Sequence, residues 1–283
     1  MPRLLQALLM LLLCSSIAGF TSHRFVSAAA SKVAVIRRRY ASSRSTTTTM
    51  MSPVLAKRPN LYVYDHCPFC VRARMIFGLK QVPHQLIFLD NDDIETPTAL
   101  VGKKVVPILE MVNTEGKTVV MPESMDIVKY VDGDSRWGKP LLKPATNRED
   151  IKAFFDSIAD LSRRCTRPRF ALSSILPEFH TPAARAAFVR NHPFKTGPFD
   201  YTENLMNTKL VSDLGEKLKD LDGLIFSADC VTEGGMSYDD IDVFGKTRGL
   251  TVVKGLVLPP KLKAYLERMA EKTEIPLYHQ MGL

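Results

Sequence analysis

Short apolar runs separated by polar turns alternate in type between residues 61 and 131. The run at 61–64 predicts a strand, and Val71, Met75 and Leu79 recur at one-turn spacing in a predicted helix. In chain order, the pattern predicts strands at 61–64, 85–89, 105–109 and 118–121, with helices at 68–80, 96–102 and from 124 onward. The order β-α-β-α-β-β-α predicts a thioredoxin-like domain.

Two of these helices have specific start signals. Thr96 followed by Pro97 has the form of an N-cap residue with proline at the first helical position. Ser124 is predicted to cap the helix whose apolar positions are Met125, Val128 and Val131.

The pattern changes to helices alone in the second half of the chain. Apolar faces recur within 151–161 and 210–221, and Thr181-Pro182 has the N-cap and proline signal of a helix start. Ser237 and Asp240 have the spacing of a capping box, and Pro260 opens the last helix. We therefore predict a thioredoxin-like domain at 59–133, a Gly- and Pro-containing linker at 134–147 and an all-α domain at 148–283, which is an α/β plus all-α fold.

Residues 1–58 differ in composition from the rest of the chain. Residues 1–19 have the basic start, apolar stretch and small residues of a signal peptide, and the apolar stretch is too short for a stable membrane span. Residues 20–58 are basic, rich in Ser and Thr and free of Asp and Glu, which is typical of a transit peptide or a disordered arm. A signal peptide followed by Phe20 resembles the bipartite presequences of algae with complex plastids. The prediction is an organelle, with the plastid favoured over the secretory pathway, the mitochondrion, or the cytosol from a start at Met50 or Met51.

The formal net charge of +8 comes from this leader. Residues 1–64 hold nine of the 38 basic residues and no acidic one, so 29 basic residues remain against 30 acidic ones. The body of the protein therefore has no net charge that favours nucleic acid, and we predict neither a nucleic-acid partner nor a membrane-bound mature form.

The motif His66-Cys67-Pro68-Phe69-Cys70 directly follows the first predicted strand. Cys67 is expected at the helix N-terminus, where free backbone N–H groups and the helix dipole favour a thiolate. Cys70, one turn later, can close a disulfide with it, and Phe69 places an aromatic surface beside the sulfur. The motif predicts thiol–disulfide exchange with Cys67 as nucleophile and Cys70 as the resolving thiol.

Two metal-binding alternatives are weaker. A zinc site needs a second Cys/His pair at suitable spacing, which the sequence does not offer, and Pro68 disfavours an iron–sulfur cluster shared by two chains. We predict no metal. Cys165 and Cys230 are isolated, and we interpret each as a buried small hydrophobe or an inert surface thiol.

Two further pairs are candidates for substrate binding. If the peptide bond before Pro107 is cis, the backbone of Val106 is exposed to pair with a peptide-like substrate; an ordinary proline at a strand entry is the alternative. Ser124 lies at a helix N-terminus that favours a carboxylate, and Glu123 could hold an ammonium group, so the pair fits an amino-acid head group; the alternative is that Ser124 only caps its own helix.

A group of arginines follows in the first helix of the second half. Arg163, Arg164, Arg167 and Arg169 lie within seven residues, and we interpret them as a solvated face, with a groove for an acidic substrate as the alternative. Arg72 and Arg74 either add positive charge near the cysteines or form a solvated face of their own helix.

Several long segments resemble the glutaredoxin-2 type of glutaredoxin, over about residues 60–283. They are LYVYDHCPFC at 61–70, ARMIFGLK at 73–80, NDDIETPT at 91–98, VPIL at 106–109, MPESMDIV at 121–128, PRF at 168–170, TPAAR at 181–185 and DDI at 239–241. The resemblance implies a glutathione-transferase-like architecture and glutathione-dependent disulfide reduction by Cys67 and Cys70.

The resemblance also implies a glutathione site. Val106, Pro107, Glu123 and Ser124 match the family's glutathione-contacting positions, and Phe69 stands where many glutaredoxins have Tyr. Glutathione is then a co-substrate with no tightly bound cofactor, and the partners are glutathione and disulfide-containing or glutathionylated proteins. The alternatives are a glutathione transferase or dehydroascorbate reductase of the same fold, and a glutathione-binding module without turnover.

Overall fold

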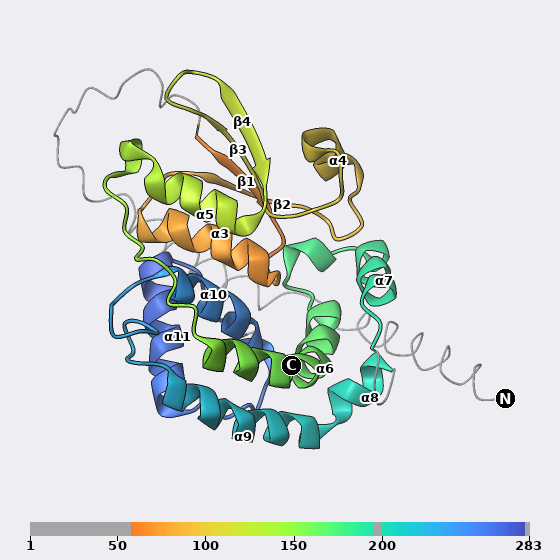
Figure 1. Cartoon of the computed structure of the whole chain (residues 1–283). Helices are drawn as coiled ribbons and strands as arrows, with labels where there is room; N and C mark the ends of the chain where they lie inside the picture. Colours follow the sequence, from red (N-terminus) through yellow and green to blue (C-terminus); the bar gives the residue numbers. More distant parts are fainter. Residues whose placement is uncertain (1–57, 195–199, 281–283) are drawn as a thin grey trace, which may run out of the picture. The chain divides into compact units, whose positions relative to one another are not determined.

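The computed structural model describes residues 58–194 and 200–280, and Figure 1 shows its elements. Its first half contains a four-stranded sheet in the order β2-β1-β3-β4, with β1 and β2 parallel and β3 antiparallel to both neighbours. The elements are β1 (Asn60–Val63), α3 (Pro68–Leu79), β2 (Gln85–Phe88), α4 (Glu95–Val101), β3 (Ile108–Val112), β4 (Thr118–Pro122) and α5 (Ser124–Gly133). The predicted thioredoxin-like topology is confirmed.

The sheet is held by apolar residues on β1, one of its two inner strands. Leu61 and Val63 of β1 are fully buried, and Leu61 pairs with Leu86 of β2 and Leu109 of β3. Helices α3 and α5 pack against each other on one face of the sheet, and α4 lies apart from them beside β3 and β4 (Figure 1). Because β1 is an inner strand and runs directly into α3, the residues between them lie at the end of the sheet.

The second half is helical, as predicted. Its elements are α6 (Glu149–Leu172), η3 (Pro177–Phe179), α7 (Pro182–Asn191), α8 (Tyr201–Met206), α9 (Thr208–Leu224), α10 (Tyr238–Thr247), η4 (Arg248–Val252) and α11 (Pro260–Thr273). Thr181 caps α7 by accepting the backbone N–H of Ala184 at 3.0 Å. Ser237 and Asp240 form the expected capping box at the start of α10. None of the described helices is both long and apolar enough to cross a membrane.

Three local predictions are wrong. Strand β3 begins at Ile108, not at residue 105, because the Val106–Pro107 peptide bond is cis and the chain turns before it enters the sheet. Helix α4 begins at Glu95, since the carboxylate of Asp93, not Thr96, accepts an N–H at the start of the helix.

The third concerns the start of α5. Glu123 occupies the N-cap position with φ of 73°, and Ser124 is the first helical residue, so Ser124 does not cap this helix as predicted.

The predicted linker at 134–147 has fixed structure. It contains the 3-10 turn η2 (Ser135–Trp137), and the carboxylate of Asp132 accepts the backbone N–H groups of Leu141 and Leu142 at 2.8 and 3.2 Å. Lys143 forms a bridge to Ser237, which ties this segment to the helical half. The exact domain limits stay a prediction, and the predicted signal and transit segments up to residue 57 lie outside the described residues.

The two halves meet through α3 and a buried ionic network. Helix α3 packs against α10 and α11, and a Cβ added at Gly78 would lie only 2.0 Å from the carbonyl oxygen of Thr273. The fully buried Arg248 donates to the backbone carbonyl of Asp65 at 2.7 Å and to its carboxylate at 3.1 Å. Burial opposes the charge on Asp65, but Arg248 and Arg74 outweigh it and lower its pKa to about 2. This network fixes the backbone two residues before Cys67.

Candidate active site

Cys67 is the N-cap residue of α3. Its backbone is extended, with φ of −72° and ψ of 122°, and its carbonyl accepts the N–H of Val71 at 3.0 Å, the first hydrogen bond of the helix. No acidic residue lies in the first turn of α3. The sulfur therefore lies at the positive end of a helix, as the sequence predicted.

The second thiol has a different environment. Cys70 is fully buried, and its sulfur accepts the backbone N–H of Tyr64 at 3.3 Å. Both cysteines are free thiols in this structure. Cys67 is partly exposed and Cys70 is not, so an incoming disulfide reaches Cys67 first.

The pKa values of the two thiols are shifted in opposite directions. A hydrogen bond from Cys70, the charge of His66 and backbone N–H groups lower the pKa of the Cys67 thiol to about 7, against the opposing effect of burial. Burial raises the pKa of the Cys70 thiol well above its usual value, and the hydrogen bond and charge of Cys67 add to this. The arrangement gives one thiolate near neutral pH and one protonated thiol beside it.

His66 is held by residues of the helical half. Its imidazole lies among Phe170, Phe179 and Phe188, with ring centroids 4.9 to 5.2 Å away. Its Nδ1 lies 2.6 Å from Oε1 of Glu178, a residue of η3 that has no exposed surface. Residues of the helical half therefore hold the His66 imidazole in place next to the nucleophile Cys67.

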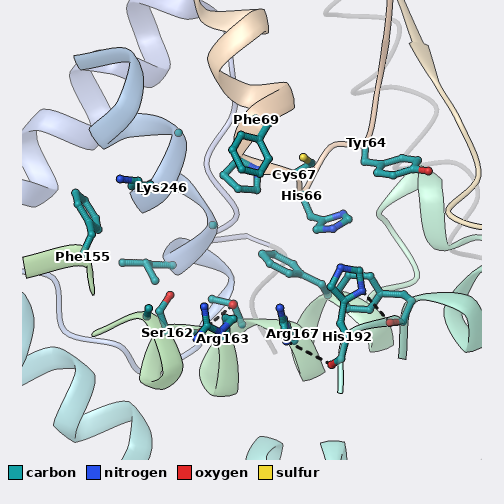
Figure 2. A pocket seen from close by; sticks show the side chains of 18 of the residues that line it. Tyr64, His66, Cys67, Phe69, Phe155, Ser162, Arg163, Arg167, His192 and Lys246 are labelled. Carbon is teal, nitrogen blue, oxygen red and sulfur yellow. Dashed lines mark hydrogen bonds between the residues drawn. The ribbon is translucent and has the colours of Figure 1, made fainter. Parts of the chain in front are cut away.

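A pocket of about 590 Å³ opens beside Cys67, between the start of α3 and helices α6, α7 and α10. Figure 2 shows Ser162, Arg163 and Arg167 extending from α6 toward the side on which Cys67 and Phe69 lie. Its wall combines apolar and basic groups, including Phe69, Val106, Phe155, Ile158, Arg163, Arg167, Phe170, Phe188, His192 and Lys246. The pocket can hold a molecule with apolar and anionic parts against the sulfur.

The structure brings some of the predicted substrate-binding residues together and leaves others outside the pocket. Phe69 and Val106 line it with Cys67, and Phe69 is half exposed with the Arg72 guanidinium 4.9 Å from its ring centre. Pro107 follows Val106 through the cis peptide bond and is buried, outside the pocket lining.

Glu123 and Ser124 lie at the other predicted position, the N-terminus of α5. The Glu123 carboxylate is exposed and lies 3.5 Å from the ammonium group of Lys103, and Ser124 is buried. Neither residue is among those that line the pocket.

The interpretation of the α6 arginines as a solvated face is wrong for most of them. Arg169 is buried and donates to the carbonyl of Cys165 at 2.6 Å, because the helix lies between other helices of this half. Arg164 donates to Asn204 at 2.7 Å. Arg163 and Arg167 line the pocket, which matches the alternative of a basic groove.

The remaining arginine and cysteine candidates are paired or buried. Arg72 pairs with Asp242 of α10, and the buried Arg74 pairs with Asp65 at 2.5 Å, so neither forms a solvated face. Cys165 and Cys230 are buried, which confirms their interpretation as small hydrophobes. Among residues 58–194 and 200–280, no group of three or more His, Cys, Asp or Glu side chains is arranged to hold a metal ion.

Sequence reasoning missed the pair His66 and Glu178. The two residues are separated by 112 positions, and Glu178 follows Pro177 in a short segment without a periodic pattern. The adjacency of His66 to Cys67 was the only signal in the sequence, and it does not point to a carboxylate partner.

The fold and the thiol pair define a class of protein: a thioredoxin-like thiol–disulfide oxidoreductase with a glutathione-transferase-like helical half. Two family models match the chain, "Glutathione S-transferase, N-terminal domain" over residues 66–133 and "Glutaredoxin 2, C terminal domain" over residues 150–282. Glutaredoxin 2 of Escherichia coli strain K12 is 42% identical over 225 residues, covering 79% of this chain and 100% of that protein.

Solved structures are also similar to this chain. Glutaredoxin 2 from Salmonella typhimurium, in complex with glutathione, is 41% identical with a TM-score of 0.72 and covers 81% of this chain and 100% of that one. A glutathione transferase from Phanerochaete chrysosporium is 14% identical with a TM-score of 0.55, covers 76% of this chain and 97% of that one, and shares the fold alone. This chain belongs to the glutaredoxin 2 family, which confirms the predicted family, fold and class of enzyme.

Proposed function

We propose that this chain reduces disulfides at Cys67 with electrons from glutathione. Membership of the glutaredoxin 2 family makes it a glutathione-dependent thiol–disulfide oxidoreductase with glutathione as co-substrate. The observation that carries the assignment of residues is the partly exposed Cys67 at the N-terminus of α3, with a pKa lowered to about 7 beside a buried, protonated Cys70.

The exchange balances in two steps. The Cys67 thiolate attacks the glutathione sulfur of a mixed disulfide, the S–S bond breaks, and the substrate thiolate leaves and takes up a proton. A second glutathione thiolate then attacks the Cys67–glutathione disulfide, which restores the Cys67 thiolate and releases oxidised glutathione. For a protein disulfide, the Cys67 thiolate attacks one sulfur and the other leaves as a thiolate that takes up a proton. Cys70 then loses its proton and attacks Cys67, which releases the second protein thiol, and two glutathione molecules reduce the Cys67–Cys70 bond and leave as oxidised glutathione.

Five residues of the first half are proposed to hold glutathione. Val106 lines the pocket beside Cys67, so its backbone can pair with the peptide part of glutathione, next to Pro107. The start of α5 offers backbone N–H groups for the γ-glutamyl carboxylate at Ser124, and the Glu123 carboxylate can accept the ammonium group. Phe69 is half exposed and lines the same pocket as Cys67, so its ring can contact the bound glutathione.

The oxidised partner is proposed to occupy the pocket on the α6 side. Arg163 and Arg167 face it together with Phe155 and Phe170, which favours a disulfide or glutathionylated cysteine flanked by acidic and apolar side chains.

The test is reduction of a glutathione mixed disulfide by the purified protein. Cys67→Ser is expected to abolish turnover, whereas Cys70→Ser is expected to keep turnover of small glutathione mixed disulfides and to lose reduction of intramolecular protein disulfides. Turnover that survives in Cys67→Ser would remove the assigned nucleophile. A large preference of the wild-type protein for dehydroascorbate over mixed disulfides would favour the reductase alternative.

The location is proposed separately. The composition of residues 1–58 supports import into an organelle, the plastid first. A fluorescent protein fused after residue 60 should accumulate in plastids of an alga with complex plastids. Fluorescence in the cytosol, the secretory pathway or mitochondria would replace this proposal with the corresponding alternative.

A further inference from the structure

The buried carboxylate of Glu178 is directed at a single residue of the motif. Its Oε1 accepts the backbone N–H of His66 at 2.9 Å and lies 2.6 Å from Nδ1 of the same residue. Its Oε2 is buried and has no hydrogen-bond partner among the described residues. Both of these hydrogen bonds therefore go to His66, and they fix the position of the residue.

The surroundings of His66 restrict the imidazole to this contact. Three phenylalanines from α6, η3 and α7 surround the ring, and the imidazole stacks against Tyr64 at 6.0 Å with an interplanar angle of 8°. The Glu178 carboxylate accepts a hydrogen bond from Nδ1 and so fixes the tilt of the ring among these aromatic side chains. His66 is held in one orientation by residues more than one hundred positions away in the chain.

We propose that Glu178 is a positioning residue for disulfide exchange, because its buried carboxylate binds both the backbone N–H and the ring of His66 and so fixes the imidazole next to the Cys67 sulfur. The proposal rests on Cys67 being the nucleophile assigned above. It makes the helical half a determinant of thiol reactivity in addition to a wall of the substrate pocket.

Burial opposes the charge on Glu178 most strongly, yet the hydrogen bonds and charge of His66 outweigh it and hold the pKa of Glu178 below its usual range. The charge of His66 in turn lowers the pKa of Cys67, and the charge of Glu178 contributes to the raised pKa of Cys70. One carboxylate thus acts on both thiols in opposite directions, directly on Cys70 and through His66 on Cys67.

Other titratable groups face this region and do not supply the same contact. Cys70 comes from α3, Tyr64 follows β1, Arg167 comes from α6, and His192 follows α7. Burial raises the pKa of Tyr64 and lowers the pKa of His192, so both favour the neutral form. Arg167 donates to the carbonyl of His192 at 3.4 Å and does not hydrogen-bond His66.

The test is the pH dependence of Cys67 alkylation by iodoacetamide, followed on the peptide that contains the motif. Glu178→Gln keeps the size and an oxygen acceptor for both donors of His66 but removes the charge. The midpoint is expected to rise by about one pH unit, so that alkylation below both midpoints slows about tenfold. Glu267→Gln, an exposed carboxylate of α11 that lies 4.0 Å from Lys263, is the matched control and should leave the midpoint in place.

A double substitution separates positioning from a general structural role. His66→Asn alone should raise the midpoint as Glu178→Gln does, and adding Glu178→Gln to it should cause no further shift. Circular dichroism and thermal unfolding establish that each variant is folded. If Glu178→Gln does not fold, the alkylation midpoint of His66→Asn tests the proposal instead.

Two results would overturn the proposal: an unchanged midpoint in Glu178→Gln or His66→Asn, or equal and additive shifts in the double variant. Alkylation measures the ionisation of Cys67 and does not require turnover. A failure of the Glu178 proposal is therefore distinguishable from a failure of the proposed function, which is tested separately by the Cys67→Ser assay.

Discussion

The two halves of the molecule approach Cys67 in different ways. The thioredoxin-like half supplies the sulfur, the helix N-terminus and the backbone around Val106 from elements that are close in sequence or share one sheet. The helical half supplies side chains from far along the chain: Glu178 against His66, Arg248 against Asp65, and the basic wall of the pocket. One half therefore carries the reactive group, and the other sets its charge environment and limits what can reach it.

The largest effect on the contact between the two halves is expected from the removal of Arg248. Replacing it with Met leaves the Asp65 carboxylate buried beside Arg74 and Tyr278 but without its fully buried partner. We expect a loss of about 3–5 kcal/mol in the free energy of unfolding, because the buried carboxylate of Asp65 loses one of its two cationic partners and the carbonyl oxygens of Asp65 and Pro276 lose a buried donor. Urea denaturation measures this.

An exposed arginine provides the comparison. Arg190→Met on the surface of α7 should change the free energy of unfolding by less than about 0.5 kcal/mol. Equal effects of the two substitutions would show that the Asp65 network does not join the halves.

The close approach of α3 and α11 gives a second test. In Gly78→Ala, the new methyl group meets the backbone of Thr273, so α3 and α11 must separate. The expected loss is about 1–3 kcal/mol of stability. Gly223→Ala in α9 is the matched control: nothing lies within 4 Å of its new Cβ, so stability should stay the same or rise by up to about 1 kcal/mol. A neutral Gly78→Ala would contradict the tight packing of the halves.

The basic wall of the pocket is expected to affect selectivity and not chemistry. Arg167→Leu should raise KM about three- to tenfold for a glutathionylated peptide with acidic residues beside the cysteine, with a smaller change for a neutral peptide, since one guanidinium is lost from a partly exposed site. Steady-state kinetics on the two peptides measures the difference. An equal loss on both peptides would argue against charge recognition at this wall.

The smallest effect is expected at Phe69. This side chain is half exposed and contributes a ring surface, and Phe69→Tyr adds a hydroxyl at its solvent-facing edge. Turnover with a glutathione mixed disulfide should change by no more than about twofold, which is less than one kcal/mol. A gain of tenfold or more would show that a hydroxyl contact to substrate is missing in this chain.

Sequence reasoning reached the reactive half more completely than the controlling half. The position of Cys67 at a helix start and the four strands follow from local patterns, and the structure contains them. In the helical half, local patterns predicted the capping of α7 and α10 but not the side chains that reach Cys67. The start of β3 was missed because the pattern does not locate the turn at the cis bond before Pro107.

The controlling half depends on contacts between distant segments, which no local pattern encodes. Glu178 lies in a single 3-10 turn, and Arg248 lies between α10 and α11. The burial of Arg169 likewise depends on a later segment, since the side chain donates to the carbonyl of Leu205 in α8. The linker is held by Asp132, which precedes it, and by the bridge from Lys143 to Ser237.

The central claim is that both halves together make Cys67 a thiolate near neutral pH, and one measurement tests it most directly. Iodoacetamide alkylation of the wild-type protein, followed peptide by peptide across pH 5 to 10, gives the ionisation of each thiol. We expect a midpoint near 7 for Cys67, with Cys70 and Cys165 reacting only at much higher pH because burial raises the pKa of both. A Cys67 midpoint at or above about 8.5, the value of an unperturbed thiol, would contradict the central claim.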